Sequence, residues 1–354
     1  LGLLRQMCSD GPTPDLLAYN AAVSACGRGR RWDLALGLVG QARTALRRPD
    51  VVTYNAAIAA CGAGQCWPGA LALLWEMASA GLEPNLISCN SAASACEKGH
   101  KWLHASALLR WMKACALEPD IVSYNAVISA CEKCGRWREA LDMLNQVLLE
   151  DNITADTVSY SAAISACEKG RSWPWALVCL GDMRRRGVGR DVIVFGAAMS
   201  ACEKGSQWHL ALSLLDQMRL ERVDSNVVAC SAAVSACEKA QEWSRALELF
   251  EERLLSGSKL DVIFCSAGIS ACEKGGRWDL ALGILGRMRR LSLRPNLITF
   301  NAAISACGRG RRWDAAVALL EDMQVQRVFP DATSYGVAAA ALEEEGHDAE
   351  ARAL

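Results

Sequence analysis

Cysteine and histidine are the residues of this chain that could ligate a metal or act as nucleophiles, and their spacing argues against both. The sequence holds 17 cysteines and 4 histidines. One Cys-x-x-Cys occurs, at Cys131 and Cys134, and no second pair follows at the spacing of a zinc site. Cys96, His100 and His104 are spaced by four residues, but they straddle an expected turn. We therefore expect no metal and no cofactor.

The motifs of common enzyme classes are also missing from the sequence. There is no phosphate-binding loop, no nucleotide-binding glycine motif and no nucleophile elbow. The His-x-Glu and Pro-Cys-x-x-Cys signature of zinc deaminases does not occur either. We expect a chain without catalytic residues.

Nine of the cysteines mark an internal repeat instead. Each closes a Ser-Ala-Cys or Ala-Ala-Cys tripeptide, the steps between them are 35 residues with a single 36, and a tryptophan follows six residues after each. The cysteines are Cys26, Cys61, Cys96, Cys131, Cys167, Cys202, Cys237, Cys272 and Cys307. The tryptophans are Trp32, Trp67, Trp102, Trp137, Trp173, Trp208, Trp243, Trp278 and Trp313.

The period divides the whole chain, residues 1–354, into one array. Residues 1–15 align with the end of a unit, and residues 332–354 form a partial or capping repeat. The nine complete units are 16–50, 51–85, 86–120, 121–156, 157–191, 192–226, 227–261, 262–296 and 297–331.

Each unit has the pattern of two helices. Tyr54, Ala57, Ile58 and Cys61 share one face of a first helix. Trp67, Ala70, Leu71, Leu74 and Met77 form the apolar stripe of a second helix. Thr53, Ser88, Ser123, Ser159 and Thr299 stand where we expect N-caps of the first helices. Gly29, Gly64, Gly99, Gly170, Gly205, Gly275 and Gly310 stand where we expect left-handed C-cap residues.

These patterns predict helix–turn–helix repeats stacked into an α-solenoid. The repeat tryptophans then pack against neighbouring repeats, and the repeat cysteines are small buried hydrophobic residues. Such regularly spaced single cysteines do not form a disulfide framework, which favours a reducing interior compartment over secretion.

Composition sets further bounds on function. Hydrophobic residues make up 52% of the chain and the net charge is −1, so nucleic-acid binding would need a local arrangement of charge. No run of about 18 apolar residues occurs, so we expect no membrane partner. The segment has no targeting peptide and does not begin with Met, and we expect it to be part of a longer protein.

The units resemble the pentatricopeptide repeat (PPR) family. The resemblance rests on Val-Thr-Tyr-Asn-Ala-Ala-Ile at 52–58, Ala-Leu-x-Leu-Leu-x-x-Met at 70–77 and Gly-Leu-Glu-Pro-Asn at 81–85, and it recurs at 123–128 and 299–304. Uniform units of 35 residues resemble the P class of that family. Tryptophan at the start of the second helix departs from the family, in which an aliphatic residue is commoner. The resemblance implies an all-α fold, a right-handed α-solenoid (superhelix) of helix–turn–helix repeats.

The resemblance also implies sequence-specific binding of single-stranded RNA, with one base read by two residues of each repeat. We call these two residues a reading pair: the residue after the aromatic position of the first helix, and the last residue of the unit. The alternative is that Asp and Asn are loop and cap residues and that Asn and Ser solvate a helix start. The pairs are Asn20/Asp50, Asn55/Asn85, Asn90/Asp120, Asn125/Asp156, Ser161/Asp191, Gly196/Asn226, Ser231/Asp261, Ser266/Asn296 and Asn301/Asp331.

By the family's code, Asn/Asp resembles a uridine reader and Asn/Asn a pyrimidine reader. Ser/Asp resembles a guanosine reader and Ser/Asn an adenosine reader, whereas Gly196 has no side chain with which to read. The predicted site is 5′-UYUUGNGAU-3′, with repeats running parallel to the RNA.

An aliphatic residue is the second residue of every complete unit. In the family this position sandwiches each base between adjacent repeats, and the alternative is ordinary packing between repeats. The residues are Leu17, Val52, Ile87, Val122, Val158, Ile193, Val228, Ile263 and Ile298.

A cation follows two residues after eight of the nine repeat cysteines. A row of cations suits a phosphate backbone, and eight neutralised phosphates would give a log–log salt slope of about −5 to −6. The alternative is favourable charge at a helix C-terminus. Acidic neighbours such as Glu97 and Glu132 offset these charges in the total. The cations are Arg28, Lys98, Lys133, Lys169, Lys204, Lys239, Lys274 and Arg309.

The resemblance implies an organellar RNA-binding protein that acts in transcript stabilisation, processing or translation. Chloroplast is slightly favoured over mitochondrion. One alternative is a protein–protein interaction scaffold, since helical solenoids also present concave surfaces to proteins. Another is the RNA-recognition segment of a longer RNA-processing enzyme.

Overall fold

The computed structural model describes residues 15–46, 49–149, 153–223, 227–255, 260–344 and 347. All regular secondary structure in these residues is α-helical, with no β-strand among them. Each unit forms a first helix that begins at its first residue and a second helix that begins at its repeat tryptophan. None of the described helices is long and apolar enough to cross a membrane.

The chain divides into two compact units, Leu1–Gly189 and Arg190–Leu354. In the first, the first helices are α2 (Leu16–Arg28), α4 (Val51–Ala63), α6 (Leu86–Lys98), α8 (Ile121–Lys133) and α10 (Thr157–Lys169). The second helices are α3 (Trp32–Leu46), α5 (Trp67–Ser79), α7 (Trp102–Ala114), α9 (Trp137–Leu149) and α11 (Trp173–Arg185).

The second compact unit continues the same order. Its first helices are α12 (Val192–Lys204), α14 (Val227–Lys239), α16 (Val262–Lys274), α18 (Leu297–Arg309) and α20 (Ala332–Glu344). Its second helices are α13 (Trp208–Leu220), α15 (Trp243–Leu255), α17 (Trp278–Arg290) and α19 (Trp313–Val325).

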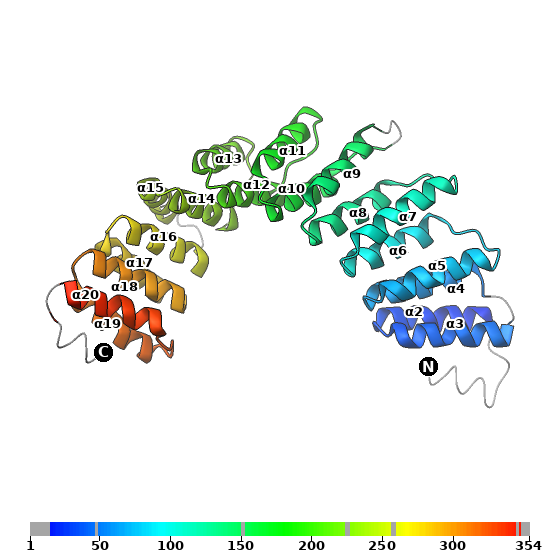
Figure 1. Cartoon of the computed structure of the whole chain (residues 1–354), viewed down its shortest axis with the longest axis horizontal. Helices are drawn as coiled ribbons and strands as arrows, with labels where there is room; N and C mark the ends of the chain where they lie inside the picture. The colour runs from blue at the N-terminus through cyan, green and yellow to red at the C-terminus, as the bar shows by residue number, and fades with distance from the viewer. Residues whose placement is uncertain are drawn as a thin grey trace. The chain divides into compact units, whose positions relative to one another are not determined.

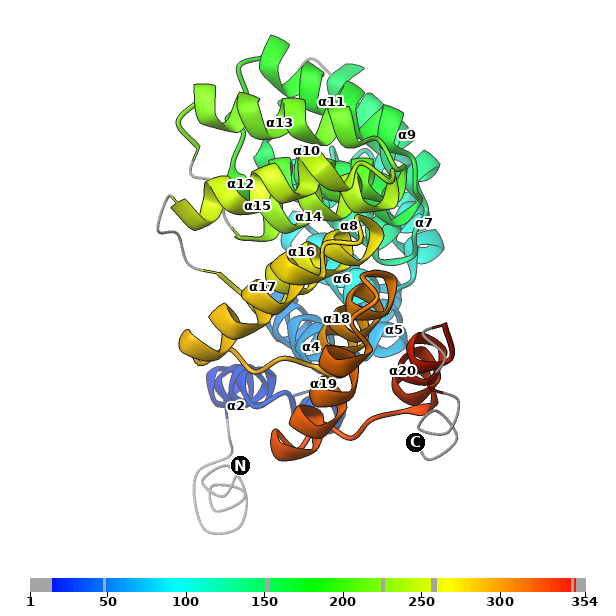
Figure 2. The same cartoon turned by 90° about the vertical axis from the view of Figure 1, so that its left-hand side faces the viewer.

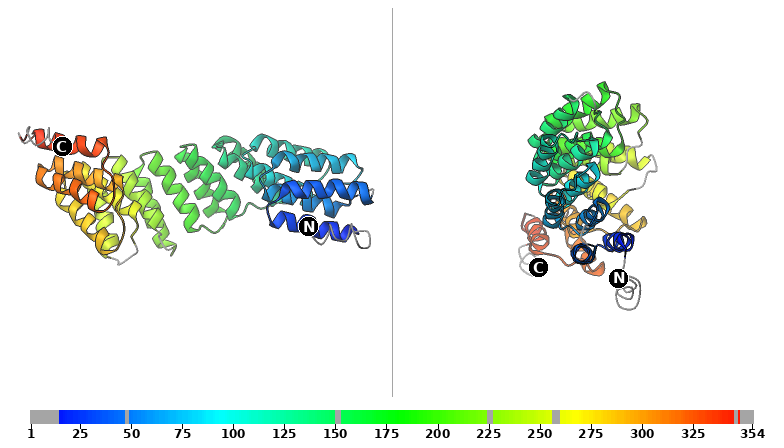
Figure 3. Two further views of the ribbon diagram at one scale, coloured as in Figure 1. Left: turned by 90° about the horizontal axis from the view of Figure 1, so that it is seen from below. Right: turned by 90° about the vertical axis from the view of Figure 1, so that its right-hand side faces the viewer.

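Within each compact unit the helices stack in two layers. Within a unit, each first helix contacts the first helix of the next repeat, and each second helix that is followed by another repeat of the same unit packs between its own first helix and the next one. Figure 1 shows the pairs following one another in chain order, and Figures 2 and 3 show the same stacking from other sides. The all-α solenoid of helix–turn–helix repeats is therefore confirmed.

The core lies between the two layers and uses the predicted helix faces. Tyr54, Ala57, Ile58 and Cys61 are at most 2% exposed, and the second-helix residues Ala70, Leu74 and Met77 are fully buried. Leu73, which the predicted stripe omits, is also buried, whereas Leu71 and Trp67 are half-buried. Burial of each large aliphatic side chain contributes about 1.5–3 kcal/mol.

The repeat cysteines are small hydrophobic residues, as expected. All nine are buried, and none forms a disulfide. Burial raises the pKa of Cys61, Cys167 and Cys272 to about 12. These thiols are therefore protonated at neutral pH and are poor nucleophiles.

The prediction that Ser and Thr are the N-caps of the first helices is wrong, because the N-cap lies three residues earlier. The N-cap is the last residue of the preceding unit, as where Asp120 Oδ1 accepts the backbone N–H of Ser123 at 2.9 Å. Asp50 caps α4 in the same way, through the backbone N–H of Thr53. An extended residue directly before a helix can reach the N–H of the third helical residue, and Asp and Asn do so as well as Ser. The expected cap residues are thus at the third helical position.

The repeat glycines are not left-handed, contrary to expectation. Gly99 has φ −82° and Gly275 φ −85°, and the residue after each has the positive φ, 55° at His100 and 63° at Gly276. The turn closes with the N–H of Lys101 donating to Cys96 O at 2.9 Å, the six-to-one bond of a Schellman motif.

The reason for glycine at this position is the tryptophan of the preceding repeat. A Cβ on Gly99 would lie 2.5 Å from Trp67 Cδ1, and one on Gly275 would lie 2.6 Å from Trp243 Cε3. Cys134 and Ala240 occupy the same position in two other repeats, so a Cβ is tolerated in those repeats. The close approach of glycine and tryptophan therefore links adjacent repeats.

Replacing this glycine should destabilise the array. We expect Gly275→Ala to lower the free energy of unfolding by about 1–2 kcal/mol, because the Trp243 ring must move. Gly283→Ala is the matched control, since Gly283 lies in α17 of the same repeat with open space around it. That change should raise stability by about 0.5–1 kcal/mol, because alanine favours helix. Urea denaturation followed by circular dichroism measures both, and equal effects would refute the steric account.

Candidate nucleic-acid interface

In the Asn-containing reading pairs, the two members meet at the boundary between adjacent repeats. Asn90 Nδ2 donates to Asp120 Oδ1 at 3.0 Å. The equivalent amide-to-carboxylate distances are 3.2 Å for Asn125 and Asp156 and 3.3 Å for Asn301 and Asp331. Two residues 30 or 31 positions apart are thus brought into contact by helix stacking.

The second member of the pair has a structural role as well. Asp120 is the N-cap of α8, and Asn85 is the N-cap of α6. The cap part of the alternative interpretation is therefore correct, and any reading role is additional to it. Burial raises the pKa of Asp120, but the backbone N–H of Ser123 and the side chains of Asn90 and Ser123 outweigh it, so the pKa is below its ordinary value. The carboxylate is ionised at neutral pH and only accepts hydrogen bonds.

A third residue joins each Asn-containing pair. The hydroxyl of Ser123 lies 2.5 Å from Asn90 Oδ1 and 2.9 Å from Asp120 Oδ1. In the first pair, Thr53 Oγ1 bridges Asn20 and Asp50 at 2.6 and 2.7 Å. Sequence reasoning placed these hydroxyls as caps and missed this contact, although its constant separation along the chain is visible in the sequence.

The remaining reading residues differ from the Asn group. Ser266 Oγ donates to Val262 O at 2.7 Å, and Ser161 is half-buried. Ser231 is 6% exposed, and its hydroxyl has no hydrogen-bond partner among the described residues. Gly196 is buried, with open space where a Cβ would stand.

The second members of these four reading pairs are the last residues of their units. Asp191 and Asp261 cap α12 and α16, and Asn296 caps α18. Asn226 lies outside the described residues.

The aliphatic series is exposed along its whole length. Its nine side chains are between 54% and 75% exposed, from Val122 to Leu17. In α4, Val52 is 58% exposed although Tyr54, two residues later, is buried in the core. The alternative that these side chains are buried between repeats is wrong, since they lie on the open side of each first helix.

One hollow brings three predicted residue classes together. Ile87, Asn90 and Lys98 of α6 line a space of about 370 Å³, closed on the other side by Ala59 and Gly62 of α4. An exposed aliphatic residue, a reading residue and a cation thus share one face of a first helix. The small residues of α4 leave the room between the two helices.

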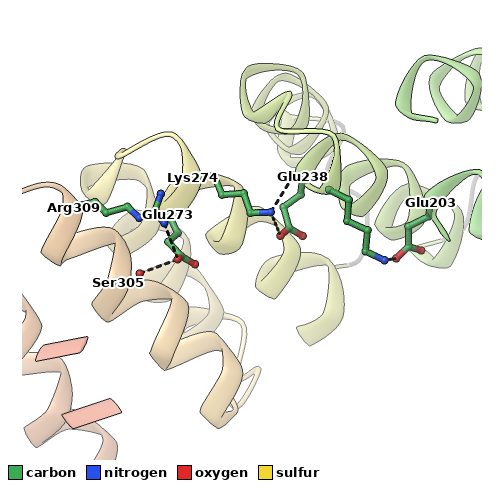
Figure 4. A network of polar contacts seen from close by, with 7 residues as sticks. Glu203, Glu238, Glu273, Lys274, Ser305 and Arg309 are labelled. Atoms are coloured by element: carbon green, nitrogen blue, oxygen red, sulfur yellow. Dashed lines mark hydrogen bonds and ion pairs between the residues drawn. The ribbon is translucent and has the colours of Figure 1, made fainter. Parts of the chain in front are cut away.

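The row of cations is paired with acids of the preceding repeat. Lys133 Nζ lies 2.9 Å from Glu97 Oε1, and Ser129 also donates to that carboxylate at 2.8 Å. Figure 4 shows Lys274 with Glu238 and Arg309 with Glu273 in the second compact unit. The ion pairs are Lys133–Glu97, Lys169–Glu132, Lys239–Glu203, Lys274–Glu238 and Arg309–Glu273.

Lys98 differs because its preceding repeat lacks the acid. The position that holds Glu in later repeats is Gly62 in this one. Lys98 is exposed and has no ionic partner among the described residues, and the same is true of Arg28. Neither cation loses an ion pair to a described residue when it binds an external anion.

The cysteine and histidine candidates do not form a site. Among the described residues, no three His, Cys, Asp or Glu side chains lie together as a metal site would require. Cys96 is buried, and the His104 ring packs on Trp67 with centroids 4.7 Å apart.

Comparison with known families decides what the array is. A family described as "Pentatricopeptide repeat domain" matches residues 2–64, 72–133 and 248–310, more than half of the chain. "PPR repeat" matches residues 52–82, 158–188, 193–223 and 298–328, and "PPR repeat family" matches 119–169. The chain belongs to the pentatricopeptide repeat family. A search of curated proteins found no match.

Solved PPR structures share the fold. The chain is similar to the pentatricopeptide repeat protein PPR10 in complex with an 18-nucleotide psaJ RNA element, at 20% identity and a TM-score of 0.78. That match covers 99% of this chain and 51% of PPR10. It is also similar to PPR10 from maize, at 23% identity and a TM-score of 0.62, over 99% of this chain and 55% of that one. The chain thus spans about half the length of these PPR proteins.

Breaking one ion pair of the PPR array should weaken it slightly. Lys274→Met removes a half-buried pair, and we expect the free energy of unfolding to fall by up to about 1 kcal/mol. Lys98→Met removes an unpaired cation and should change stability by less than about 0.5 kcal/mol. Urea denaturation at low and high salt tests this, because salt should reduce the difference between the variants. A larger loss for Lys98→Met would contradict the pairing.

Proposed function

We propose that this chain binds single-stranded RNA in a sequence-specific manner, with one base per repeat. The proposal rests on the reading pairs, whose donors and acceptors have a defined order beside exposed aliphatic side chains. In this proposal the chain has no catalytic residues and acts on organellar transcripts, as the family implies.

The Asn/Asp pair suits uracil. Asn90 Nδ2 uses one N–H for Asp120, which leaves a second N–H beside a carboxylate oxygen. A base that fits must offer a carbonyl acceptor next to an N–H donor. The Watson–Crick edge of uracil has this order, whereas N3 of cytosine is an acceptor and would face the carboxylate. We expect U at the bases opposite Asn20/Asp50, Asn90/Asp120, Asn125/Asp156 and Asn301/Asp331.

Replacement of Asp by Asn in the pair exchanges an acceptor for a donor. Asn85 Oδ1 accepts the backbone N–H of Ser88 at 3.0 Å, so its amide nitrogen points away from the helix end. A donor at this place suits N3 of cytosine. The Asn55/Asn85 pair therefore reads a pyrimidine in our proposal, in agreement with the family code.

The exposed aliphatic residues supply a surface for the bases. Exposure of the apolar surface of Val or Ile to water is unfavourable, and a base that packs on such a side chain removes this surface from solvent. Adjacent repeats present one such side chain each, and the hollow between Ile87, Asn90 and Lys98 has the residues to contact base edge, base face and phosphate. We propose this sandwich for all nine aliphatic residues.

The phosphate contribution should be smaller than the sequence alone suggests. Five of the eight cations already have a carboxylate within 3.9 Å, and a phosphate must compete with it. Among the described residues, Lys98 and Arg28 have no such competitor. We propose that these two make the main phosphate contacts.

A titration tests the function directly. The purified chain should bind 5′-UCUUGAGAU-3′ more tightly than a permuted strand of the same composition. With two available cations the log–log salt slope should be about −1 to −2, because each neutralised phosphate contributes about −0.7. Fluorescence anisotropy at two salt concentrations gives both results. Equal binding to the two strands would refute base reading, and no binding to either would favour the protein-interaction scaffold.

The donor and acceptor order predicts a switch of specificity. Asp120→Asn should change the preference at the third base from U to C by about tenfold, since a carboxylate acceptor becomes an amide donor. Stability should be retained because Asn caps a helix as well as Asp. Asn85→Asp is the reciprocal variant and should favour U at the second base. Competition binding with single-base variants of the RNA measures this, and unchanged preferences in both variants would contradict the assignment.

A further inference from the structure

The third residue of each first helix places a hydroxyl against the reading residue of the preceding repeat. Ser123 Oγ lies 2.5 Å from Asn90 Oδ1, and Ser159 Oγ lies 2.6 Å from Asn125 Oδ1. All five Asn reading residues have such a partner, 33 or 34 positions later. The pairs are Asn20–Thr53, Asn55–Ser88, Asn90–Ser123, Asn125–Ser159 and Asn301–Ser334.

The identity of the third residue follows the identity of the reading residue. Where the reading residue is Asn, the next repeat always has Ser or Thr. Where it is not, three of the four equivalent positions are apolar: Val194 after Ser161, Ala229 after Gly196 and Phe264 after Ser231. Ser266 keeps a hydroxyl partner, with Thr299 Oγ1 at 2.7 Å. A residue needed only for helix capping would not follow its neighbour in this way.

The repeat with Phe264 shows the effect of losing the hydroxyl at the third position. Ser231 lies 33 positions before Phe264, and its buried hydroxyl has no hydrogen-bond partner in the part of the chain that the structure describes. Phe264 itself is fully buried and stacks on Phe250. An apolar residue at the third position therefore leaves the reading side chain without the contact that the Asn-containing repeats have.

The chemistry of the group fixes the orientation of the reading amide. Asp120 is ionised and only accepts, so the amide atom 3.0 Å away must be the nitrogen of Asn90. The amide oxygen then faces Ser123, whose hydroxyl donates to it. The Ser123 side chain is buried, so this contact is shielded from competing water. The remaining N–H of Asn90 is held in a single direction.

We propose that this buried hydroxyl is a positioning residue for base selection. It holds the reading Asn of the preceding repeat so that the free N–H points toward the base, and without it the amide rotates toward solvent. Ser123 thus governs the third base, although Asn90 and Asp120 contact it. The inference rests on the proposed RNA-reading function and adds a residue outside the reading pair.

The test measures discrimination at one base, which a merely structural role would not change selectively. Wild type should prefer 5′-UCUUGAGAU-3′ over 5′-UCCUGAGAU-3′ by about tenfold. Ser123→Ala should reduce this preference to about twofold and leave the preference at the fourth base, read by Asn125 and Asp156, unchanged. Ser123→Thr should restore the preference, because threonine keeps the hydroxyl.

Ser129→Ala is the matched control. Ser129 is also in α8, and its hydroxyl also donates to the preceding repeat, but to Glu97. Its loss should leave base preferences unchanged. Ser159→Ala provides a second variant, since Ser159 Oγ donates to Asn125 Oδ1, and should weaken only the preference at the fourth base, read by Asn125 and Asp156.

The outcomes separate the two proposals. The positioning role would be overturned if Ser123→Ala kept its full preference for U at the third base. It would also be overturned if Ser123→Ala and Ser129→Ala lost preference equally at all bases. Either result would leave RNA reading intact. A wild-type chain that binds both strands equally would overturn the reading function, and this inference with it.

Discussion

Among the described residues, the N-terminus of each first helix other than α14 depends on the last residue of the preceding repeat. Asp120 accepts the backbone N–H of Ser123 at the start of α8, and Asn85 accepts that of Ser88 at the start of α6. The position is therefore restricted to residue types that accept hydrogen bonds from a helix start, and these types can also bond to a base. Since Asp and Asn cap equally well, helix stability does not choose between them. The choice at each repeat is free to follow another requirement, and the proposed base preference supplies one.

The same stacking that places the cap divides each first helix into two faces. In α4, Tyr54 and Ile58 pack into the core, whereas Val52 is left in solvent and Asn55 is half-buried at the edge. The close approach of repeats, set in part by glycine against tryptophan, brings residues about 33 positions apart within hydrogen-bond distance. An exposed aliphatic side chain and an oriented polar pair are then repeated at each boundary. Regular packing thus gives a regular surface of exposed aliphatic side chains and oriented polar pairs.

The sequence predicts the elements better than the contacts between them. Period and apolar spacing were enough for the helix pairs and for the buried stripe of Tyr54, Ala57, Ile58 and Cys61. They did not show that Asp50 rather than Thr53 is the cap. Both residue types cap helices, and which of them does so depends on the residue at which the helix begins. The role of Gly275 was also missed, since the position of the Trp243 ring depends on how one repeat rotates against the next. The pairing of Lys133 with Glu97 was missed for the same reason, because it also depends on how adjacent repeats are placed. By contrast, the association of Asn90 with the hydroxyl of Ser123 is visible in the sequence, because Ser or Thr follows each Asn reading residue 33 or 34 positions later.

Charge pairing between repeats changes how affinity and specificity would be divided. Cations that bind carboxylates of the same protein attract polyanions weakly, in keeping with the net charge of −1. Under the proposed function, such a protein would gain little from phosphates alone and would hold non-specific strands poorly. Its affinity would then depend on contacts to base edges and base faces, which differ between sequences. Where Gly62 replaces the acid, Lys98 is released and lies in the hollow beside Ile87 and Asn90. One local phosphate contact would then place the strand, while the reading pairs on either side select it.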